Sequence, residues 1–213
     1  MIECKQIEYQ ESKICVLTND LSSKELLSFF ENKDLYKNEL KSISTEHKKK
    51  DFISVRYALK KCMNGKEQVI YYTPKGKPFL YKNKNRISVS HTKNWVAVII
   101  HKDRKVGIDI EKPRKTLIKV AKKFLSPTEF DFYNQLTKDE GFIFLRIVWS
   151  AKEALFKIVG DAYNFSEQLH ALPFEINKEK GELKLIHTDT GKTYLMQYIL
   201  TQNYTLTYCV DNE

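Results

Sequence analysis

The sequence lacks paired cysteines, long apolar runs and, in its first half, enough acidic residues to balance its lysines. The four cysteines are scattered, with no C-x-x-C pair: Cys4, Cys15, Cys62 and Cys209. This spacing is typical neither of a metal site nor of a disulfide framework, so we expect a reducing, cytoplasmic compartment. The longest strongly apolar run, residues 95–100, is too short to cross a bilayer, and the first residues contain no apolar signal core. We therefore expect no membrane association and no signal peptide.

The charge is unevenly distributed along the 213 residues. Residues 1–105 contain 22 Lys and Arg against 12 Asp and Glu, a balance of +10, whereas residues 106–213 contain 14 against 15, a balance of −1. The basic half is expected either to meet phosphates or an acidic partner, or to serve only as a solubility surface. The apolar content of 42%, with 12 Tyr and 12 Phe, indicates a globular protein and not a disordered one.

Hydrophobic periodicity predicts an α+β protein with two halves of similar organisation, 1–105 and 106–213. The first half is expected to contain two strands within 2–17, a helix over 44–62, a strand near 69–72 and a hairpin over 87–100. The second half is expected to contain a strand over 106–111, helices near 115–123, after Ser126 and over 137–159, and strands around 182–187, 193–200 and 203–210. Both halves therefore run strand, helices, strands.

The helix over 137–159 is apolar on nearly every side, which predicts a buried helix. Four polar side chains nevertheless fall within one stripe about 60° wide, because they are spaced four, three and four residues apart. They are Arg146, Ser150, Glu153 and Lys157. Buried charges are costly unless something pairs with them, so the stripe suggests a reaction centre or an ion site.

Two further carboxylates lie on the strand over 106–111. Asp109 and Glu111 share one face of that strand, and Gly107 leaves room beside them. Close carboxylates repel unless a cation joins them, and with Glu153 they would offer three hard oxygen ligands of the kind that Mg²⁺ binds. Alternatively, Asp109 and Glu111 face solvent from an edge strand. The addition of a buried Glu153 favours the metal site.

Several basic residues of the first half are candidates for phosphate contacts. Lys49 and Arg56 share one face of the helix over 44–62 and could bind a phosphate, whereas a solvated helix face is expected for Lys48 and Lys50. Lys77 lies in a basic turn beside a glycine, and His91 follows Ser90 where a strand ends. His91 can donate a hydrogen bond to a phosphate, or it can be a hairpin histidine bonded to the backbone.

Four motifs in this order resemble the 4′-phosphopantetheinyl transferase superfamily, in particular its longer, surfactin-synthetase-activator type. They are Gly76-Lys77-Pro78, Ser88-Val-Ser-His91, Gly107-Ile-Asp109-Ile-Glu111 and Trp149-Ser-Ala-Lys152-Glu153-Ala-Leu-Phe-Lys157. The last two are specific together, and the resemblance spans about residues 45–160. It implies a fold of two α+β halves related by a pseudo-two-fold axis, acting as a monomer. The implied activity is Mg²⁺-dependent transfer of the 4′-phosphopantetheine arm of coenzyme A to a serine of an apo acyl or peptidyl carrier protein, with release of 3′,5′-ADP.

The resemblance also implies roles for individual residues. Asp109, Glu111 and Glu153 would hold Mg²⁺, Glu153 would act as general base, and Lys157 would neutralise charge on the leaving group. The coenzyme A phosphates would be contacted by basic and hydroxyl side chains of the first half: Lys49, Arg56, Lys77, Ser90 and His91. Lys48 and Lys50 are the alternatives to Lys49 in this set.

Three more expectations concern the long helix. Arg146 and Ser150 are expected to orient Glu153, because they lie on its stripe. Lys152 lies on another side of the helix, and a carrier-protein contact or a structural contact is expected for it.

Two other functions are weighed: a different Mg²⁺-dependent phosphate-transfer enzyme, and a basic nucleic-acid-binding protein. Against nucleic-acid binding, the basic residues are not interleaved with the aromatic residues that stack on bases, and the three carboxylates would have no role.

Overall fold

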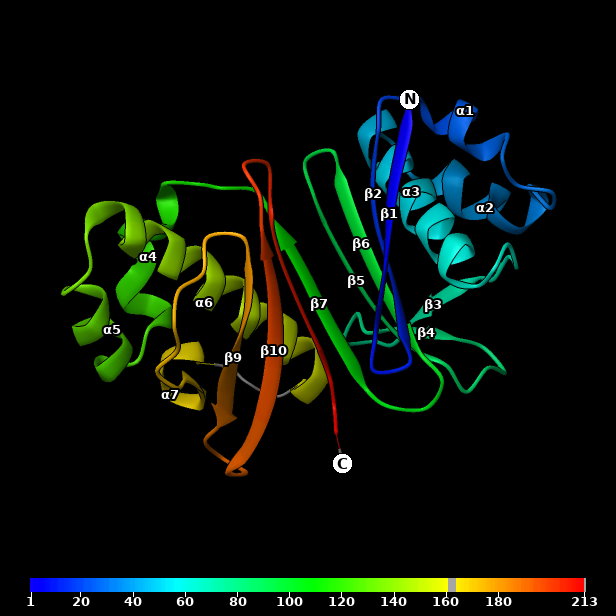
Figure 1. The fold of residues 1–213 in the computed structure, drawn as a ribbon. Coiled ribbons are helices and arrows are strands. Elements are labelled where there is room, and N and C mark those ends of the chain that lie inside the picture. Colours follow the sequence, from blue (N-terminus) through cyan, green and yellow to red (C-terminus); the bar gives the residue numbers. More distant parts are fainter. Residues whose placement is uncertain (161–163, 213) are drawn as a thin grey trace. The chain divides into compact units, whose positions relative to one another are not determined.

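The computed structural model describes residues 1–160 and 164–212. It is an α+β protein, as the sequence predicts, and its contacts divide it into two compact units, Met1–Val106 and Gly107–Glu213 (Figure 1). None of the helices in the described part of the chain has the length and apolar character that crossing a bilayer requires.

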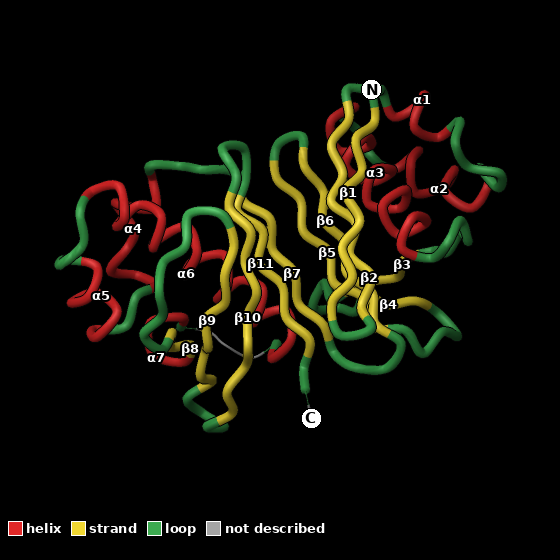
Figure 2. The backbone as a smooth tube through the Cα atoms, viewed as in Figure 1, coloured by secondary structure: helices red, strands yellow, loops and turns green. Residues whose placement is uncertain are grey.

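The N-terminal unit is built on a four-stranded antiparallel sheet in the order β1-β2-β6-β5 (Figure 2). Its strands are β1 (Ile2–Tyr9), β2 (Ser12–Asn19), β5 (Arg86–Thr92) and β6 (Trp95–His101). A separate hairpin pairs β3 (Ile70–Tyr72) with β4 (Pro78–Leu80). The predicted strands and the 87–100 hairpin are thus confirmed, and β4 is an addition to the prediction.

Three helices pack on this unit: α1 (Ser23–Leu27), α2 (Asp34–Ser42) and α3 (Glu46–Cys62). The helix α3 buries Ile53, Ala58 and Leu59 in a cluster that also contains apolar residues of β2 and β6. Met63 caps this helix, and Asn64 and Gly65 then adopt positive φ, which is the turn that the Asn-Gly pair predicts.

The C-terminal unit contains a five-stranded sheet in the order β7-β11-β10-β9-β8. Its strands are β7 (Val106–Glu111), β8 (Leu169–Ala171), β9 (Lys180–His187), β10 (Lys192–Leu200) and β11 (Thr205–Val210). Its helices are α4 (Thr116–Phe124), α5 (Pro127–Tyr133), α6 (Lys138–Val159) and α7 (Phe165–Gln168).

The helix α6 is the buried centre of this unit. Its N-terminus is fixed by a capping box in which Thr137 and Glu140 satisfy each other's backbone N–H groups, and its C-terminus ends at Gly160 with a φ of 77°. Apolar side chains on one side of α6 pack on the sheet, and those on another side pack on α4 and the segment after it. The helix predicted over 137–159 is confirmed.

Candidate active site

The strand β7 and the helix α6 approach each other very closely at Gly107. A Cβ atom at this position would lie only 2.1 Å from the backbone carbonyl oxygen of Ala154. Glycine is therefore required by the close packing of the strand on the helix. We expected Gly107 to make room beside the carboxylates, whereas the room it provides is taken by the helix backbone. Asp109 on β7 and Glu153 on α6 are close enough for the charge of Asp109 to raise the pKa of Glu153.

Asp109 is only 4% exposed, and its carboxylate accepts a hydrogen bond at each oxygen. Its Oδ1 accepts a hydrogen bond from the Lys157 ammonium at 3.0 Å, and its Oδ2 accepts one from the Ser150 hydroxyl at 2.8 Å. The Ser150 hydroxyl also lies 2.9 Å from the hydroxyl of Thr207 on β11. Lys157 donates a second hydrogen bond, to the Ile108 carbonyl, at 2.7 Å. These contacts fix one carboxylate in a buried position.

Glu111 is positioned by Arg114 and Trp149, and no role is expected for either residue from the sequence. The Arg114 guanidinium donates to its Oε1 at 3.1 Å, and the Trp149 indole N–H lies 3.4 Å from the same oxygen. Arg114 follows Glu111 by three residues, a spacing that is visible in the sequence, but its conformation in the loop is not. The pKa of Glu111 is raised, first by burial and then by the charge of Asp109.

The pKa of Glu153 is also raised. Burial is the largest cause, followed by the negative charge of Asp109, while the Lys157 ammonium acts in the opposite direction. Glu111 adds a further increase. The three carboxylates therefore interact electrostatically, and two of them are costly to keep ionised in the folded protein.

The carboxylates fit a divalent cation by their chemistry but are not gathered into a finished ligand set. In residues 1–160 and 164–212, no group of three or more His, Cys, Asp and Glu side chains is arranged to hold a metal ion. The Lys157 ammonium is instead the cation that contacts Asp109. The charge of Asp109 raises the pKa values of Glu111 and Glu153, and a bound Mg²⁺ would offset this repulsion between hard oxygen donors.

Two expectations about α6 are corrected. Arg146 does not contact Glu153, because its guanidinium donates to the Thr205 hydroxyl at 3.0 Å and to the Thr201 and Tyr204 carbonyls at 3.0 and 3.2 Å. It ties α6 to the turn before β11. Ser150 orients Asp109, and not Glu153 as the stripe suggested.

Lys152 is fully buried, so the structural contact expected for it is correct and a carrier-protein contact is not. Its ammonium donates to Glu129 Oε2 at 2.6 Å and to the Phe124 carbonyl at 2.7 Å. Glu129 also caps the N-terminus of α5 through Ser126, so the pair joins α5 to α6.

The N-terminal unit contains a cavity of about 620 Å³ beside α3. Arg56, which is 2% exposed, lines it, and its guanidinium lies 3.3 Å from the centre of the Phe52 ring. One nitrogen donates to the Phe52 carbonyl at 3.1 Å. Glu39 and Tyr72 lie near the guanidinium. Among the described residues, however, neither Nε nor Nη2 of Arg56 makes a hydrogen bond of good geometry. A buried cation with unused donors beside a cavity is suited to an anionic ligand.

The predicted phosphate contacts are distributed over different surfaces. His91 lines the cavity, as do Gly76 and Pro78 on either side of Lys77. Ser90 is buried in β5, whereas the neighbouring His91 is exposed, because successive strand residues face opposite sides.

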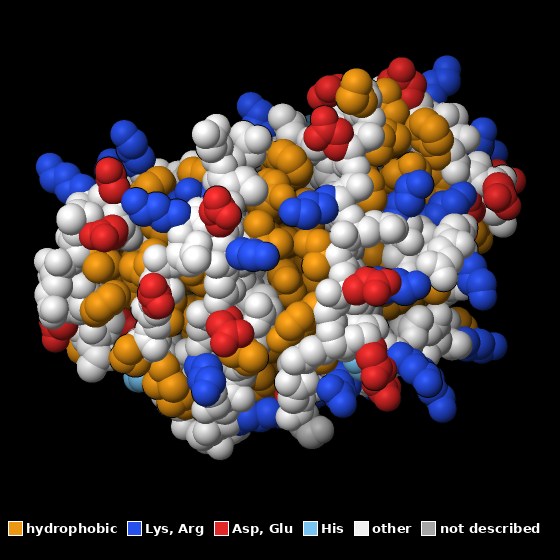
Figure 3. Space-filling view, in the orientation of Figure 1, with side chains coloured by type: hydrophobic (Ala, Val, Ile, Leu, Met, Phe, Trp, Pro, Cys, Tyr) orange, Lys and Arg blue, Asp and Glu red, His pale blue; other side chains and the backbone are white. Residues whose placement is uncertain are grey.

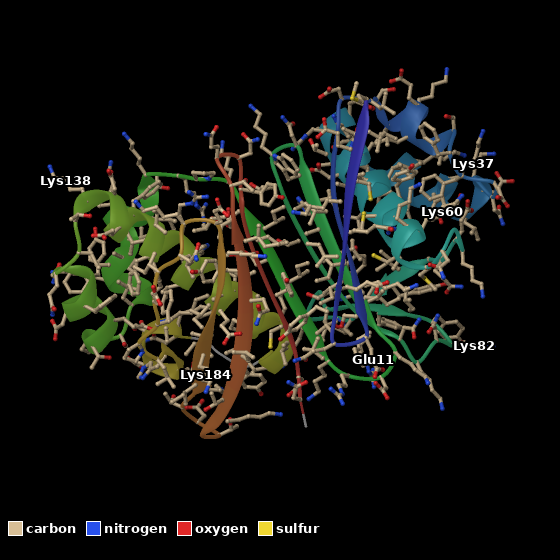
Figure 4. The ribbon with its side chains drawn as sticks, in the orientation of Figure 1. Glu11, Lys37, Lys60, Lys82, Lys138 and Lys184 are labelled. Atoms are coloured by element: carbon tan, nitrogen blue, oxygen red, sulfur yellow. The ribbon has the colours of Figure 1, made fainter. Side chains whose placement is uncertain are left out.

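Lys48 lines the cavity with Arg56, whereas Lys49 lies in a separate groove between α1 and α2. Four other lysines line that groove: Lys24, Lys33, Lys37 and Lys41. Figure 3 shows Lys and Arg side chains around α1 and α2, and Figure 4 labels Lys37 on α2. Of these two lysines, the structure groups Lys48 with Arg56.

Comparison with known proteins supports the resemblance that the motifs suggested. Residues 105–209 match the family model of the 4′-phosphopantetheinyl transferase superfamily. The chain is 27% identical over 128 residues to the 4′-phosphopantetheinyl transferase Sfp of Bacillus subtilis (strain 168), covering 57% of this chain and 53% of that protein.

Two further relatives are similar over shorter segments. The 4′-phosphopantetheinyl transferase HetI of Nostoc sp. is 30% identical over 105 residues, covering 46% of this chain and 44% of the relative. The 4′-phosphopantetheinyl transferase psf-1 of Bacillus pumilus is 31% identical over 102 residues, covering 46% and 43%. The chain thus spans about half the length of the curated relatives that it matches.

Proposed function

Because its C-terminal unit belongs to the 4′-phosphopantetheinyl transferase superfamily, we propose that this protein transfers the 4′-phosphopantetheine arm of coenzyme A to a serine of an apo carrier protein. The observation that carries the proposal is the group formed by Asp109, Glu111 and Glu153 on β7 and α6, with Lys157 beside it. The reaction forms a bond from the serine oxygen to the phosphorus of the arm and breaks the diphosphate bond, so that 3′,5′-ADP leaves.

In this proposal Glu153 accepts the proton of the carrier serine. Burial and Asp109 raise the pKa of Glu153 in the metal-free protein, and a bound Mg²⁺ would lower it again, so that the carboxylate is ionised and able to accept a proton. Asp109 is held by Ser150 and Lys157, so it offers a fixed negative charge opposite Glu153. Lys157 would place its ammonium near the oxygen of the leaving group as that oxygen gains charge.

Asp109, Glu111 and Glu153 would hold Mg²⁺. When bound, the ion would supply positive charge against the diphosphate and lower the cost of keeping the three carboxylates ionised. Arg114 and Trp149 would keep the Glu111 carboxylate in place. In the N-terminal unit, Arg56 and Lys48 would bind a phosphate group of coenzyme A, with His91 as a further donor at the same cavity.

The helix α4 provides a surface for the carrier protein. It begins five residues after Glu111, and it buries Leu117, Ala121 and Phe124. Its other side exposes Ile118, at 49%, among basic residues: Lys115, Lys119, Lys122 and Lys123. An exposed apolar side chain ringed by positive charge fits an acidic protein surface.

The proposal is tested by mass spectrometry. Incubation with coenzyme A, Mg²⁺ and a panel of apo carrier proteins should raise a carrier's mass by one phosphopantetheine unit, and Asp109→Asn should prevent this. Ile118→Glu should raise the KM for the carrier and leave the KM for coenzyme A unchanged. No mass gain across several carriers would contradict the assignment.

A further inference from the structure

The first β-hairpin of the chain brings two cysteine sulfurs together. Cys4 lies on β1 and Cys15 on β2, and the pairing of Cys4 with Leu17 and of Gln6 with Cys15 places the two cysteines diagonally on one face of the hairpin. Their Sγ atoms are 2.7 Å apart. The spacing of 11 residues carries no motif, which is why the sequence indicated no disulfide. Figure 4 labels Glu11, which lies in the turn between β1 and β2.

The two thiols differ in their surroundings. Cys15 is fully buried in the core of the N-terminal unit, whereas Cys4 is half-buried on the outermost strand of its sheet. The Cys15 thiol and, to a smaller degree, the Lys61 ammonium lower the pKa of Cys4 to about 7, while hydrogen bonding to Cys4 and burial raise the pKa of Cys15. A reagent from solvent can therefore reach Cys4 first, and Cys4 carries the more thiolate.

The remaining cysteines are placed differently. Cys62 is buried, and its thiol points to the Val98 carbonyl at 3.8 Å. Cys209 is fully buried in the C-terminal unit, with its thiol on the Val210 carbonyl. Only two of the four cysteines thus have sulfur atoms positioned for direct reaction with each other in the described structure, and both lie in one hairpin.

We propose that Cys4 and Cys15 form a modification site: an intramolecular disulfide made by reaction with a low-molecular-weight disulfide. A disulfide bond is about 2.05 Å long, so the sulfurs need to approach by only about 0.7 Å from their present separation of 2.7 Å. This inference does not depend on the proposed transferase function.

The reaction balances with the disulfide RSSR as oxidant. The Cys4 thiolate attacks one sulfur of RSSR, which breaks its S–S bond, releases RS⁻ and leaves Cys4 as a mixed disulfide. Cys15 then loses its proton and attacks the Cys4 sulfur, and the second RS⁻ leaves. Overall the two cysteines lose two hydrogens and RSSR becomes two RSH.

The test uses the full-length reduced protein and oxidised glutathione. The expected product is lighter by two hydrogen atoms, carries no glutathione, and yields on non-reducing tryptic digestion a linked pair of peptides, residues 1–5 and 14–24. Dithiothreitol should separate them. A stable glutathione adduct on the wild-type protein, a link to Cys62, or no loss of thiols would each overturn the proposal.

Three variants separate the two steps. Cys15→Ala should stop at a stable glutathione adduct on Cys4, because the second thiol is missing. Cys4→Ala should remain unmodified, because Cys15 is buried. Cys62→Ala is the matched control and should form the disulfide like the wild type. The peptide map of the wild-type protein decides the proposal even if a core variant fails to fold.

Discussion

The close approach of β7 to α6 makes Gly107→Ala the sharpest single test of the candidate active site. The new Cβ would lie 2.1 Å from the Ala154 carbonyl oxygen, 3.0 Å from the Ala154 carbonyl carbon and 3.0 Å from Cγ1 of Ile158. The nearest of these atoms is backbone, so no side-chain rotation removes the clash. Strand and helix must move apart.

The size of the movement follows from the distance. Ordinary contact begins at 3.4 Å, so the carbonyl and the new methyl must separate by about 1.3 Å. The strand carries Asp109 and the helix carries Glu153 and Lys157, so the 3.0 Å contact between Asp109 and Lys157 would lengthen beyond hydrogen-bonding distance. Overpacking of this kind costs about 1–3 kcal/mol of stability. A misplacement of about 1 Å at a reacting centre can cost about 100-fold in rate.

The assay measures the transfer rate to a carrier protein and the free energy of unfolding in urea. We expect Gly107→Ala to lose about 100-fold in kcat while remaining folded at 25 °C. Gly141→Ala is the matched control, since Gly141 lies in the first turn of the same helix. Its new methyl would lie 2.9 Å from Cε2 of Tyr133, a half-exposed side chain of α5. That ring can turn, so the rate should not change. Wild-type kcat in Gly107→Ala would refute the idea that this contact sets the active-site geometry.

Three further predictions concern buried charges and the phosphate cavity. Because the folded-state pKa of Glu153 is raised, the stability gained from its protonated form is present below the ordinary value of 4.5 and is lost as pH rises through the raised pKa. Glu153→Gln should therefore raise the metal-free thermal midpoint at pH 7 and abolish any stabilisation by Mg²⁺. An unchanged midpoint would contradict the idea that the ionised Glu153 carboxylate destabilises the fold. Lys152→Met should cost about 3–5 kcal/mol in urea unfolding by leaving Glu129 unpaired, and addition of Glu129→Gln should recover most of it; full stability of the single variant would contradict this. Lys48→Ala should raise the KM for coenzyme A about 10-fold, whereas Lys49→Ala should leave it within about twofold, and the reverse order would place the phosphate in the α1–α2 groove.

Local patterns in the sequence predict the elements well where capping and periodicity agree. The Thr137–Glu140 capping box and the apolar run after it specify α6, and the Ser126–Glu129 box specifies α5. The helix α2 was not predicted; its apolar side chains include only one buried residue, Tyr36, and its N-cap Lys33 makes no side-chain cap. The sequence signal for this helix is correspondingly weak.

The periodicity of the sequence does not show which side chains meet in the folded protein. The stripe on α6 places Arg146 on the same side of the helix as Glu153, but the groups that Arg146 meets belong to residues 201–205, which only the sheet brings close. The same holds for Cys4 and Cys15, which become neighbours through the register of the hairpin. A face of a helix or strand can be predicted from spacing, whereas the side chain opposite it depends on tertiary structure.

Two adjacent residues of α6, Lys152 and Glu153, differ in how their charges are compensated. Lys152 is satisfied by Glu129 and two backbone carbonyls, so its burial is compensated within the protein. Glu153 faces another side of the helix, and none of the hydrogen bonds or ion pairs among the described residues reaches it, while Asp109 repels its charge. The charge of this half-buried carboxylate is therefore left for a bound ligand to compensate. A divalent cation supplies that compensation, so the metal should stabilise the wild-type protein most at a pH above the raised pKa of Glu153. Equal stabilisation by Mg²⁺ of the wild type and of Glu153→Gln would show that the ion binds elsewhere.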